Sequence, residues 1–449
     1  MEKLFKLKEH GTDVKTEIIA GITTFLAMAY ILAVNPSYLG GIDGMSAGAV
    51  FSATAISAGI ATLCMAFFAN YPVALASGMG LNAFFAFTVC GAMGYSYKVA
   101  LTAVFIEGII FMLLSLFKFR EALVNKIPSN LKFAITAGIG LFIAIIALLN
   151  ANVVIASEST TVALGELSSP TVVLSLVGLL IIGALQHYKV LGGILLGILI
   201  TWVLGIIAQL VGWYVPNPEA GVYSVIPQFS LSSFEAPKMF QFDFGFIAKN
   251  VPAFILIVFT FLYTDIFDTV GTLIGVAEKG KLLDKDGSLP NATGALMADA
   301  VGTVVGACFG TSTVTSYVES SAGVAAGGRT GLTAVTTAVL FFISLIFAPI
   351  FTSIPSFATT PAMLYVGLLM LSSIRQVKFD GDIADAIGAF LAIIMMPLTY
   401  SIANGIMFGI VSWVILKLVT GKAKDISAVM WISVVLFAEF INIFRKHKV

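Results

Sequence analysis

Runs of about twenty apolar residues recur along this 449-residue chain and constrain its fold more than any other feature. A helix needs about 20 residues to cross a hydrocarbon core of roughly 30 Å. At that length we count fourteen candidate spans, so we expect an all-α polytopic membrane protein. The spans are roughly 18–35, 47–69, 72–92, 97–117, 131–149, 171–186, 190–213, 250–277, 292–310, 313–327, 331–351, 357–374, 382–398 and 401–419.

The composition excludes several classes of protein. Hydrophobic residues make up 59% of the chain and charged residues 11%, whereas soluble domains have about 25% charged residues. The 24 basic and 24 acidic residues cancel, so no net charge attracts nucleic acid. Cys64, Cys90 and Cys308 lie in apolar stretches without metal-ligand spacing, and no Ser/His or Cys/His pair lies within the spans. We therefore expect neither an enzyme nor a bound metal or cofactor.

The basic residues predict the orientation. Cytoplasmic loops of membrane proteins are enriched in Lys and Arg. With residues 1–17 in the cytoplasm, all basic residues except Lys98, Lys238 and Lys249 fall on the cytoplasmic side. We expect a multi-pass protein of the cell membrane, with 214–249 as an extracytoplasmic loop. The apolar stretch 426–444 has basic residues at both ends, so we interpret it as an interfacial cytoplasmic helix, with a fifteenth span as the alternative.

The two halves of the chain share short sequence matches in the same order. Because seven spans is an odd number, the second half must enter the membrane from the opposite side. Such inverted repeats are typical of secondary transporters. The matches are Thr24-Phe-Leu with Thr260-Phe-Leu, Ile127-Pro-Ser and Gly140-Leu with Ile354-Pro-Ser and Gly367-Leu, and Gly193-Ile-Leu-Leu-Gly-Ile with Gly405-Ile-Met-Phe-Gly-Ile.

The third and tenth spans are poor helices, and they are equivalent under the repeat. Each begins with turn-forming and β-forming residues, at 72–76 and at 313–317, before a short helix starts. Interrupted helices in corresponding positions indicate a substrate site near the membrane midplane. Extended backbone at that depth must be buried in protein or line a cavity. We expect the two stretches to pair as short strands, with both helix N-termini directed at one cavity.

Acidic residues inside the spans are the strongest candidates for a site, because an ionisable group in hydrocarbon is costly. No Lys or Arg lies deep in a span. Asp265 and Asp268 are three residues apart, on one face of a helix. The alternative is a purely structural role, in which Ser and Thr hydroxyl groups between helices hydrogen-bond to Asp265 and Asp268 and in which Asp299 bridges helices. The acids within the spans are Glu107, Asp265, Asp268, Asp299 and Glu319.

We assign substrate binding to Glu319, Asp265, Asn82 and Tyr317. Asn82 offers a donor and an acceptor to a flat polar ligand, and Tyr317 could stack on a ring. We assign proton coupling to Asp268, Asp265, Glu319 and Asp299. A neutral, flat, hydrogen-bonding solute fits this set best, because the spans lack a basic residue to hold an anion. An inorganic-anion carrier is the weaker alternative, and an ion channel is weaker still.

Three motifs stand out in the broken and acidic spans: Gly78-Met-Gly-Leu-Asn-Ala-Phe-Phe-Ala-Phe, Thr264-Asp-Ile-Phe-Asp-Thr-Val-Gly-Thr-Leu and Glu319-Ser-Ser-Ala-Gly-Val. These motifs and the N-terminal stretch 22–36 resemble the AzgA-like purine permeases, a branch of the nucleobase–cation symporter-2 family (nucleobase:ascorbate transporter-like). The resemblance covers nearly the whole chain. The Glu319 motif departs from the Glu/Gln-Asn-x-Gly form of the xanthine and uracil branches, which argues against those bases as main substrates.

The resemblance implies proton symport of hypoxanthine, guanine or adenine on a seven-plus-seven inverted-repeat fold. Residues 18–117 and 250–351 would form a core domain that slides along a gate domain of 131–213 and 355–420. Glu319 would hydrogen-bond the purine, and Asp265 or Asp268 would bind substrate or proton. Asn82 would set affinity. The implied partners are the purine base, the proton and bilayer lipid, and a homodimer is left open.

Overall fold

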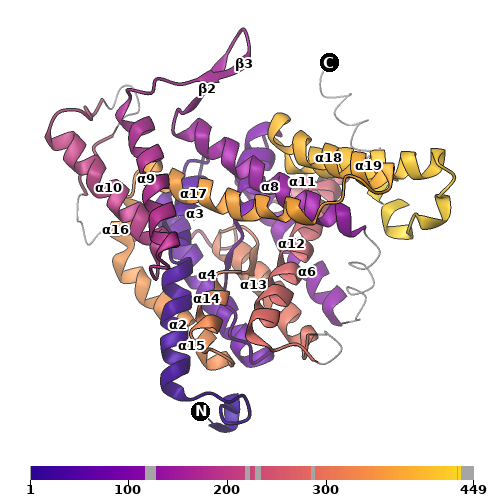
Figure 1. Ribbon diagram of the computed structural model, residues 1–449, viewed down its shortest axis with the longest axis horizontal. Helices are drawn as coiled ribbons and strands as arrows, with labels where there is room; N and C mark the ends of the chain where they lie inside the picture. Colours follow the sequence, from indigo (N-terminus) through magenta and orange to yellow (C-terminus); the bar gives the residue numbers. More distant parts are fainter. Residues whose placement is uncertain are drawn as a thin grey trace.

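The computed structural model describes residues 2–116, 128–217, 223–227, 234–284, 289–431 and 433–435. Eleven helices of this described part are long and apolar enough to cross a membrane, and Met79–Ala92 and Ile383–Leu398 are shorter apolar helices. The chain is therefore a multi-pass membrane protein (Figure 1). The main helices are α2 Val14–Met28, α3 Ile31–Leu39, α4 Ala47–Phe68, α6 Tyr97–Leu116, α8 Ser129–Asn150, α9 Pro170–His187, α10 Gly193–Leu210, α12 Val251–Gly280, α13 Ala292–Phe309, α15 Gly331–Ser344, α17 Ser356–Leu371, α18 Ile383–Leu398 and α19 Ile402–Val419.

The third and tenth segments are broken as expected. In the third, strand β1 (Leu75–Ser77) leads into α5 (Met79–Ala83) and a π-helix (Phe84–Ala92). In the tenth, β4 (Val314–Ser316) leads into the short helix α14 (Ser320–Ala325). The two strands pair antiparallel, which confirms the expected pairing. The strand in the third segment begins at Leu75, later than the extended stretch 72–76 that the sequence predicts.

Threonine side chains complete the hydrogen bonding of this small sheet. Thr62 of α4 donates to the Leu75 carbonyl at 3.1 Å and accepts from its N–H at 2.9 Å. Thr303 of α13 donates to the Val314 carbonyl at 2.9 Å. Because buried backbone groups need partners at membrane depth, these hydroxyls take the place of further strands. They allow a two-stranded sheet to persist in the middle of a helical protein.

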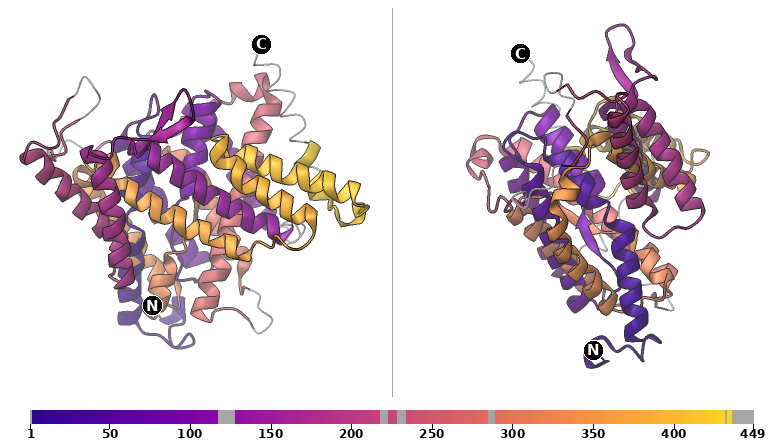
Figure 2. Two further views of the ribbon diagram at one scale, coloured as in Figure 1. Left: turned by 45° about the horizontal axis from the view of Figure 1, so that its top comes forward. Right: turned by 90° about the vertical axis from the view of Figure 1, so that its left-hand side faces the viewer.

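The helices pack in two groups. One contains α2, α3, α4, α6, α12, α13, α14 and α15 around the β1–β4 pair, and the other contains α8, α9, α10, α17, α18 and α19. The second group lies across the upper part of Figure 1, above the first. After rotation, α8, α17, α18 and α19 still lie side by side (Figure 2). Contacts between the groups involve α2, α3 and α5 on one side and α8, α10 and α17 on the other.

The sequence repeat has a structural counterpart in the second group. Pro128 and Pro355 are the N-caps of α8 and α17. Gly140 and Gly367 meet where these helices cross: a Cβ on Gly140 would lie 2.6 Å from the Gly367 carbonyl oxygen, and the reverse distance is 2.7 Å. Small residues allow such close approach of membrane helices. The repeated glycines therefore mark a reciprocal contact between the two halves.

Two features differ from the sequence-based expectation. The first segment forms one span, Val14–Leu39, but its regular α-helical bonding loosens at Ala29–Tyr30, between α2 and α3. A β-hairpin, β2 (Val154–Ser157) with β3 (Thr161–Leu164), also follows α8, so strands are not confined to the broken segments. β-Branched residues on both sides of a polar turn explain this hairpin. Most of the stretch 426–444 lies outside the described residues.

Candidate functional site

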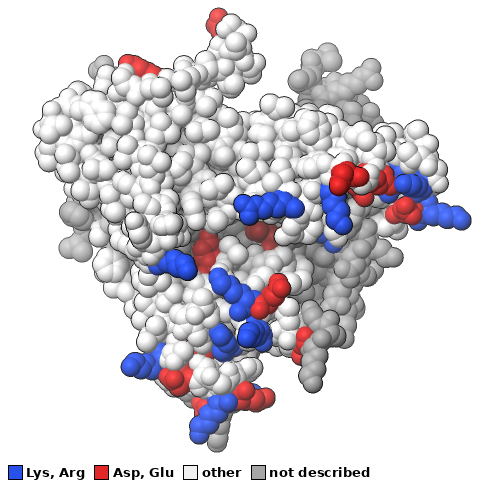
Figure 3. All heavy atoms as spheres, in the orientation of Figure 1, with Lys and Arg blue, Asp and Glu red and all other residues white. Residues whose placement is uncertain are grey.

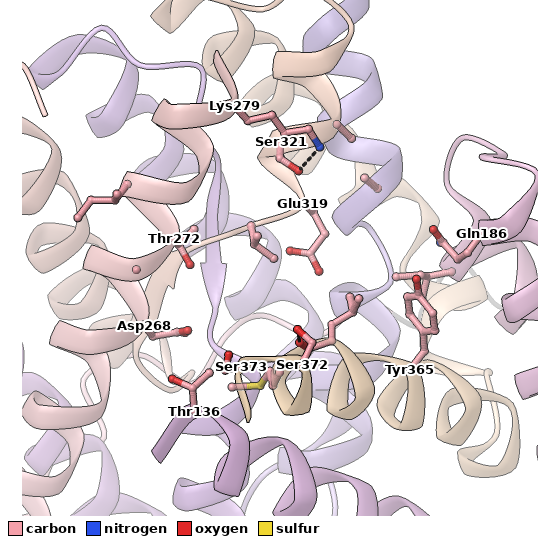
Figure 4. A pocket seen from close by; sticks show the side chains of 18 of the residues that line it. Thr136, Gln186, Asp268, Thr272, Lys279, Glu319, Ser321, Tyr365, Ser372 and Ser373 are labelled. Carbon is pink, nitrogen blue, oxygen red and sulfur yellow. Dashed lines mark hydrogen bonds between the residues drawn. The ribbon is translucent and has the colours of Figure 1, made fainter. Parts of the chain in front are cut away.

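A cavity of about 1020 Å³ lies between the two helix groups. Its wall on the first group comes from α12 and from the segment that leads into α14. Its opposite wall comes from α8, the connection between α9 and α10, α17 and the short 3₁₀ helix that follows α17. The polar lining includes Asp268, Thr272, Glu319 and Ser321 from the first group and Thr136, Gln186, Tyr365, Ser372 and Ser373 from the second (Figure 4).

Glu319 and Asp268 are the two predicted site residues that line this cavity. Glu319 is the N-cap residue of α14, and Asp268 lies in the middle of α12. Both carboxyl groups point into the cavity (Figure 4). The Tyr30 hydroxyl donates to Glu319 Oε1 at 2.6 Å. The cavity thus presents two acidic groups on one wall and hydroxyl groups on the other.

Asp265 and Asp299 lie away from the cavity and are fully buried. The Thr269 hydroxyl bonds to Asp299 Oδ2 at 2.8 Å and reaches Asp265 Oδ1 at 3.4 Å. Ser316 Oγ donates to Asp299 Oδ1 at 3.0 Å. These bonds connect α12, α13 and β4. In this conformation both acids therefore belong to the packing behind the cavity wall, and Asp299 does bridge elements.

Asn82 and Tyr317 are also buried away from the cavity lining, close to the strand pair. Ser312 donates to the Asn82 side-chain oxygen. The Tyr317 hydroxyl donates to the Ser77 carbonyl at 2.5 Å, so it links the β4 end to β1. In this structure Asn82 and Tyr317, which the sequence predicts to contact substrate, instead hold the broken segments together. Phe84 packs edge-on against Phe261 with ring centroids 4.7 Å apart, which is ordinary core packing.

Sequence reasoning missed Tyr30 and the polar residues of the second wall. Tyr30 gave no signal because it lies in an apolar run, and the contact with Glu319 spans 289 residues of sequence. Thr136 and Tyr365 are isolated polar residues in apolar helices, which is a weak signal. Glu107, the remaining acid within the spans, is buried in α6.

Lysines also line the cavity. The sequence did not predict them, because no Lys or Arg lies deep in a span. They are Lys132 in the first turn of α8, Lys189 after α9 and Lys279 near the end of α12. Figure 3 shows acidic atoms in a hollow of the molecular surface with basic atoms around it. Long side chains at helix ends can reach a cavity in this way. Among the described residues, no group of three or more His, Cys, Asp or Glu side chains could hold a metal ion.

The sequence matches a family model described as "Permease family" over residues 15–408. The guanine/hypoxanthine permease PbuO of Bacillus subtilis is 44% identical over 98% of this chain and 100% of its own length. The adenine permease AdeQ of Escherichia coli is 42% identical over 98% of this chain and 95% of its own. A putative permease of Methanocaldococcus jannaschii is 45% identical over 98% and 97%.

Solved structures support the fold. The transmembrane domain of the cyanobacterial bicarbonate transporter BicA aligns with a TM-score of 0.65 at 16% identity, over 87% of this chain and 96% of that domain. Murine Slc26a9, an anion transporter, aligns with a TM-score of 0.63 at 12% identity, over 90% and 68%. At these identities the likeness shows the fold alone. It confirms the expected seven-plus-seven inverted repeat.

Proposed function

The chain belongs to this permease family, within the nucleobase–cation symporter-2 group, and from that premise we propose that it imports purine nucleobases by proton symport. It is a transporter and not an enzyme. Relatives that it matches end to end are named as adenine or guanine/hypoxanthine permeases. The observation that carries the proposal is the cavity between the helix groups, with Glu319 and Asp268 on one wall.

The chemistry of the cavity suits a flat, neutral base. Carboxylate oxygens accept the N–H groups of a purine, and hydroxyls donate to or accept from its ring nitrogens and carbonyl groups. Glu319 and Asp268 supply the acceptors, and Thr136, Ser372 and Ser373 supply hydroxyls on the opposite wall. A base held between these walls contacts both helix groups. Binding therefore couples to the relative position of the two groups.

Two acids in the cavity wall and a third behind it support proton coupling. Asp268 interacts electrostatically with Glu319 and with Asp299 behind the wall. Neighbouring carboxylates at membrane depth repel one another, and a proton bound among them reduces that repulsion. We propose that this shared proton enters with the base. A neutral base plus a proton carries one positive charge inward, worth about 2.3 kcal/mol per 100 mV.

We propose that the first helix group acts as the moving core and the second as the gate, in an elevator-type cycle. The β1–β4 pair and its threonine partners tie the broken segments to α4 and α13, so the binding residues would travel as one unit. The lysines around the cavity belong to the side expected to face the cytoplasm. The structure would then be the inward-open state of a transporter in the cell membrane.

The test is a competition assay in proteoliposomes, with labelled hypoxanthine against adenine, guanine, xanthine, uracil and bicarbonate. We expect saturable uptake that adenine or guanine reduces and that bicarbonate leaves unchanged. Bicarbonate is included because lysines line the cavity, as an anion carrier would require. Uptake that uracil, xanthine or bicarbonate blocks, and that neither adenine nor guanine reduces, would contradict the proposed substrate class.

Substitutions of the acids test coupling in the same vesicles. We expect Glu319→Gln and Asp268→Asn each to abolish uptake driven by a pH gradient, because each removes an ionisable carboxylate from the cavity wall. We expect the same loss in Asp265→Asn, which removes a buried acid behind that wall. The control is Glu9→Gln, which alters an exposed residue paired with Lys6. Full pH-driven accumulation in Glu319→Gln would exclude its coupling role.

A further inference from the structure

One oxygen of the Glu319 carboxylate already has a partner in the protein. Tyr30 follows α2 and is the N-cap residue of α3, and its side chain is 1% exposed. Its hydroxyl donates to Glu319 Oε1 at 2.6 Å. That length is typical of an O–H bond to an ionised acceptor, which is among the stronger hydrogen bonds in proteins. Among the described residues, Tyr30 is the side chain that donates to this carboxylate.

The Tyr30–Glu319 contact is held in place at the far end of α2. Glu17, a fully buried residue in the first turn of α2, accepts from Thr333 Oγ1 of α15 at 2.6 Å. Between the two anchor points, Gly323 of α14 packs so closely on α2 that an added Cβ would lie 2.1 Å from an α2 side-chain oxygen. Helix α2 is therefore fixed against the segment that carries Glu319. The phenol has little freedom to leave the carboxylate.

We propose that Tyr30 sets base specificity by restricting Glu319 to one-point recognition of the purine. This inference rests on the proposed function. A carboxylate with both oxygens available accepts two parallel N–H bonds from a planar donor pair. Guanine carries such a pair in its N1–H and 2-amino groups, whereas hypoxanthine has N1–H alone. Because Oε1 already accepts a short bond from Tyr30, it is a weaker acceptor for a second N–H, so a base with one donor at this edge is recognised as well as a base with two.

The wild-type protein provides the first measurement. Inhibition constants are compared for hypoxanthine and guanine, which both carry N1–H and differ by the 2-amino group. We expect the 2-amino group to change affinity by less than about threefold. A preference of about tenfold or more for the 2-amino base would overturn the proposal, since one added bond to a charged group is worth at least that ratio.

Tyr30→Phe provides the second measurement. Removing the hydroxyl frees Oε1, so we expect the guanine-to-hypoxanthine affinity ratio to rise roughly tenfold, the equivalent of one hydrogen bond to a charged group. The matched control is Tyr38→Phe in α3. The Tyr38 hydroxyl is also buried, and among the described residues it has no hydrogen-bond partner. That substitution should leave the ratio unchanged.

The outcomes separate the inference from the proposed function. An unchanged ratio in Tyr30→Phe, or an equal change in Tyr38→Phe, contradicts the role of Tyr30 while purine transport stands. If Tyr30→Phe folds but no longer transports, the same ratio is measured from ligand-induced shifts of its melting temperature in detergent. A wild-type protein that neither binds nor takes up any purine contradicts the proposed function itself.

Discussion

Lys417 in the last turn of α19 shows how this chain accommodates a basic residue in a helix. Its side chain is 7% exposed, and its Nζ lies 2.7 Å from Asp382 Oδ2, at the start of α18. Lys422 reaches the same oxygen at 2.8 Å. The Lys417 ammonium also lies 5.2 Å from the Trp413 ring centroid. An ammonium group with so little exposure is tolerated because it is paired with a carboxylate and because it contacts an aromatic face.

Asp382→Asn should lower the melting temperature in detergent, because it leaves the buried Lys417 without its main partner. Hydrogen bonds from Lys417 and Lys422 hold the pKa of Asp382 well below its usual range. A lowered pKa in the folded state stabilises the protein at pH values above the ordinary carboxyl pKa of about 3.9, and that contribution is lost as the pH falls below it. The effect of the substitution should therefore be full at pH 5 to 8.

The matched control is Glu9→Gln, which removes an exposed ion pair with Lys6 whose side chains are 61% and 66% exposed. Exposed pairs contribute little to stability. We expect no shift in the melting temperature for this variant. Equal shifts in both variants would show that the Asp382 cluster contributes no more than a surface pair.

At the scale of the element, the crossing of α8 and α17 depends on two glycines. Gly140→Ala would place a Cβ 2.6 Å from the Gly367 carbonyl oxygen, so the helices must separate. We expect a loss of about 1 to 3 kcal/mol, as for other overpacked interfaces. The control Gly183→Ala in α9 adds its Cβ to open space and should be neutral or slightly stabilising. Thermal unfolding of the two variants measures the difference, and similar curves would exclude a tight crossing.

The elements show what the sequence could and could not predict. The broken segments were predictable because β-forming residues replace apolar ones at 313–317, and the β1–β4 pairing confirms them. The loosened helical bonding at Tyr30 was not predictable, since neither Gly nor Pro marks it. Asp265 and Asp268 differ by three residues and so by about 60° around the helix. The packing of α14 and β4 against α12, together with the Thr269–Asp299 hydrogen bond to α13, decides that Asp268, and not Asp265, lines the cavity.

At the scale of the whole molecule, the architecture separates two tasks. Thr62 and Thr303 complete the strand pair within one helix group, and the reciprocal contact of Gly140 with Gly367 holds the other together. The cavity lies between the groups and has walls from both. A purine bound there would contact both groups, so its binding would depend on how the two groups are placed relative to each other. The inverted repeat was predictable from short matches, but the position of the cavity required the packing of distant segments.

Charge movement during transport tests the central claim of proton-coupled purine uptake most directly. Proteoliposomes are adsorbed on a solid-supported membrane, and the current that follows a jump in hypoxanthine concentration is recorded at equal pH on both sides. We predict a saturable inward positive current that Asp268→Asn abolishes and Glu9→Gln retains. Saturable uptake of labelled hypoxanthine by the same vesicles with no charge movement would contradict the claim.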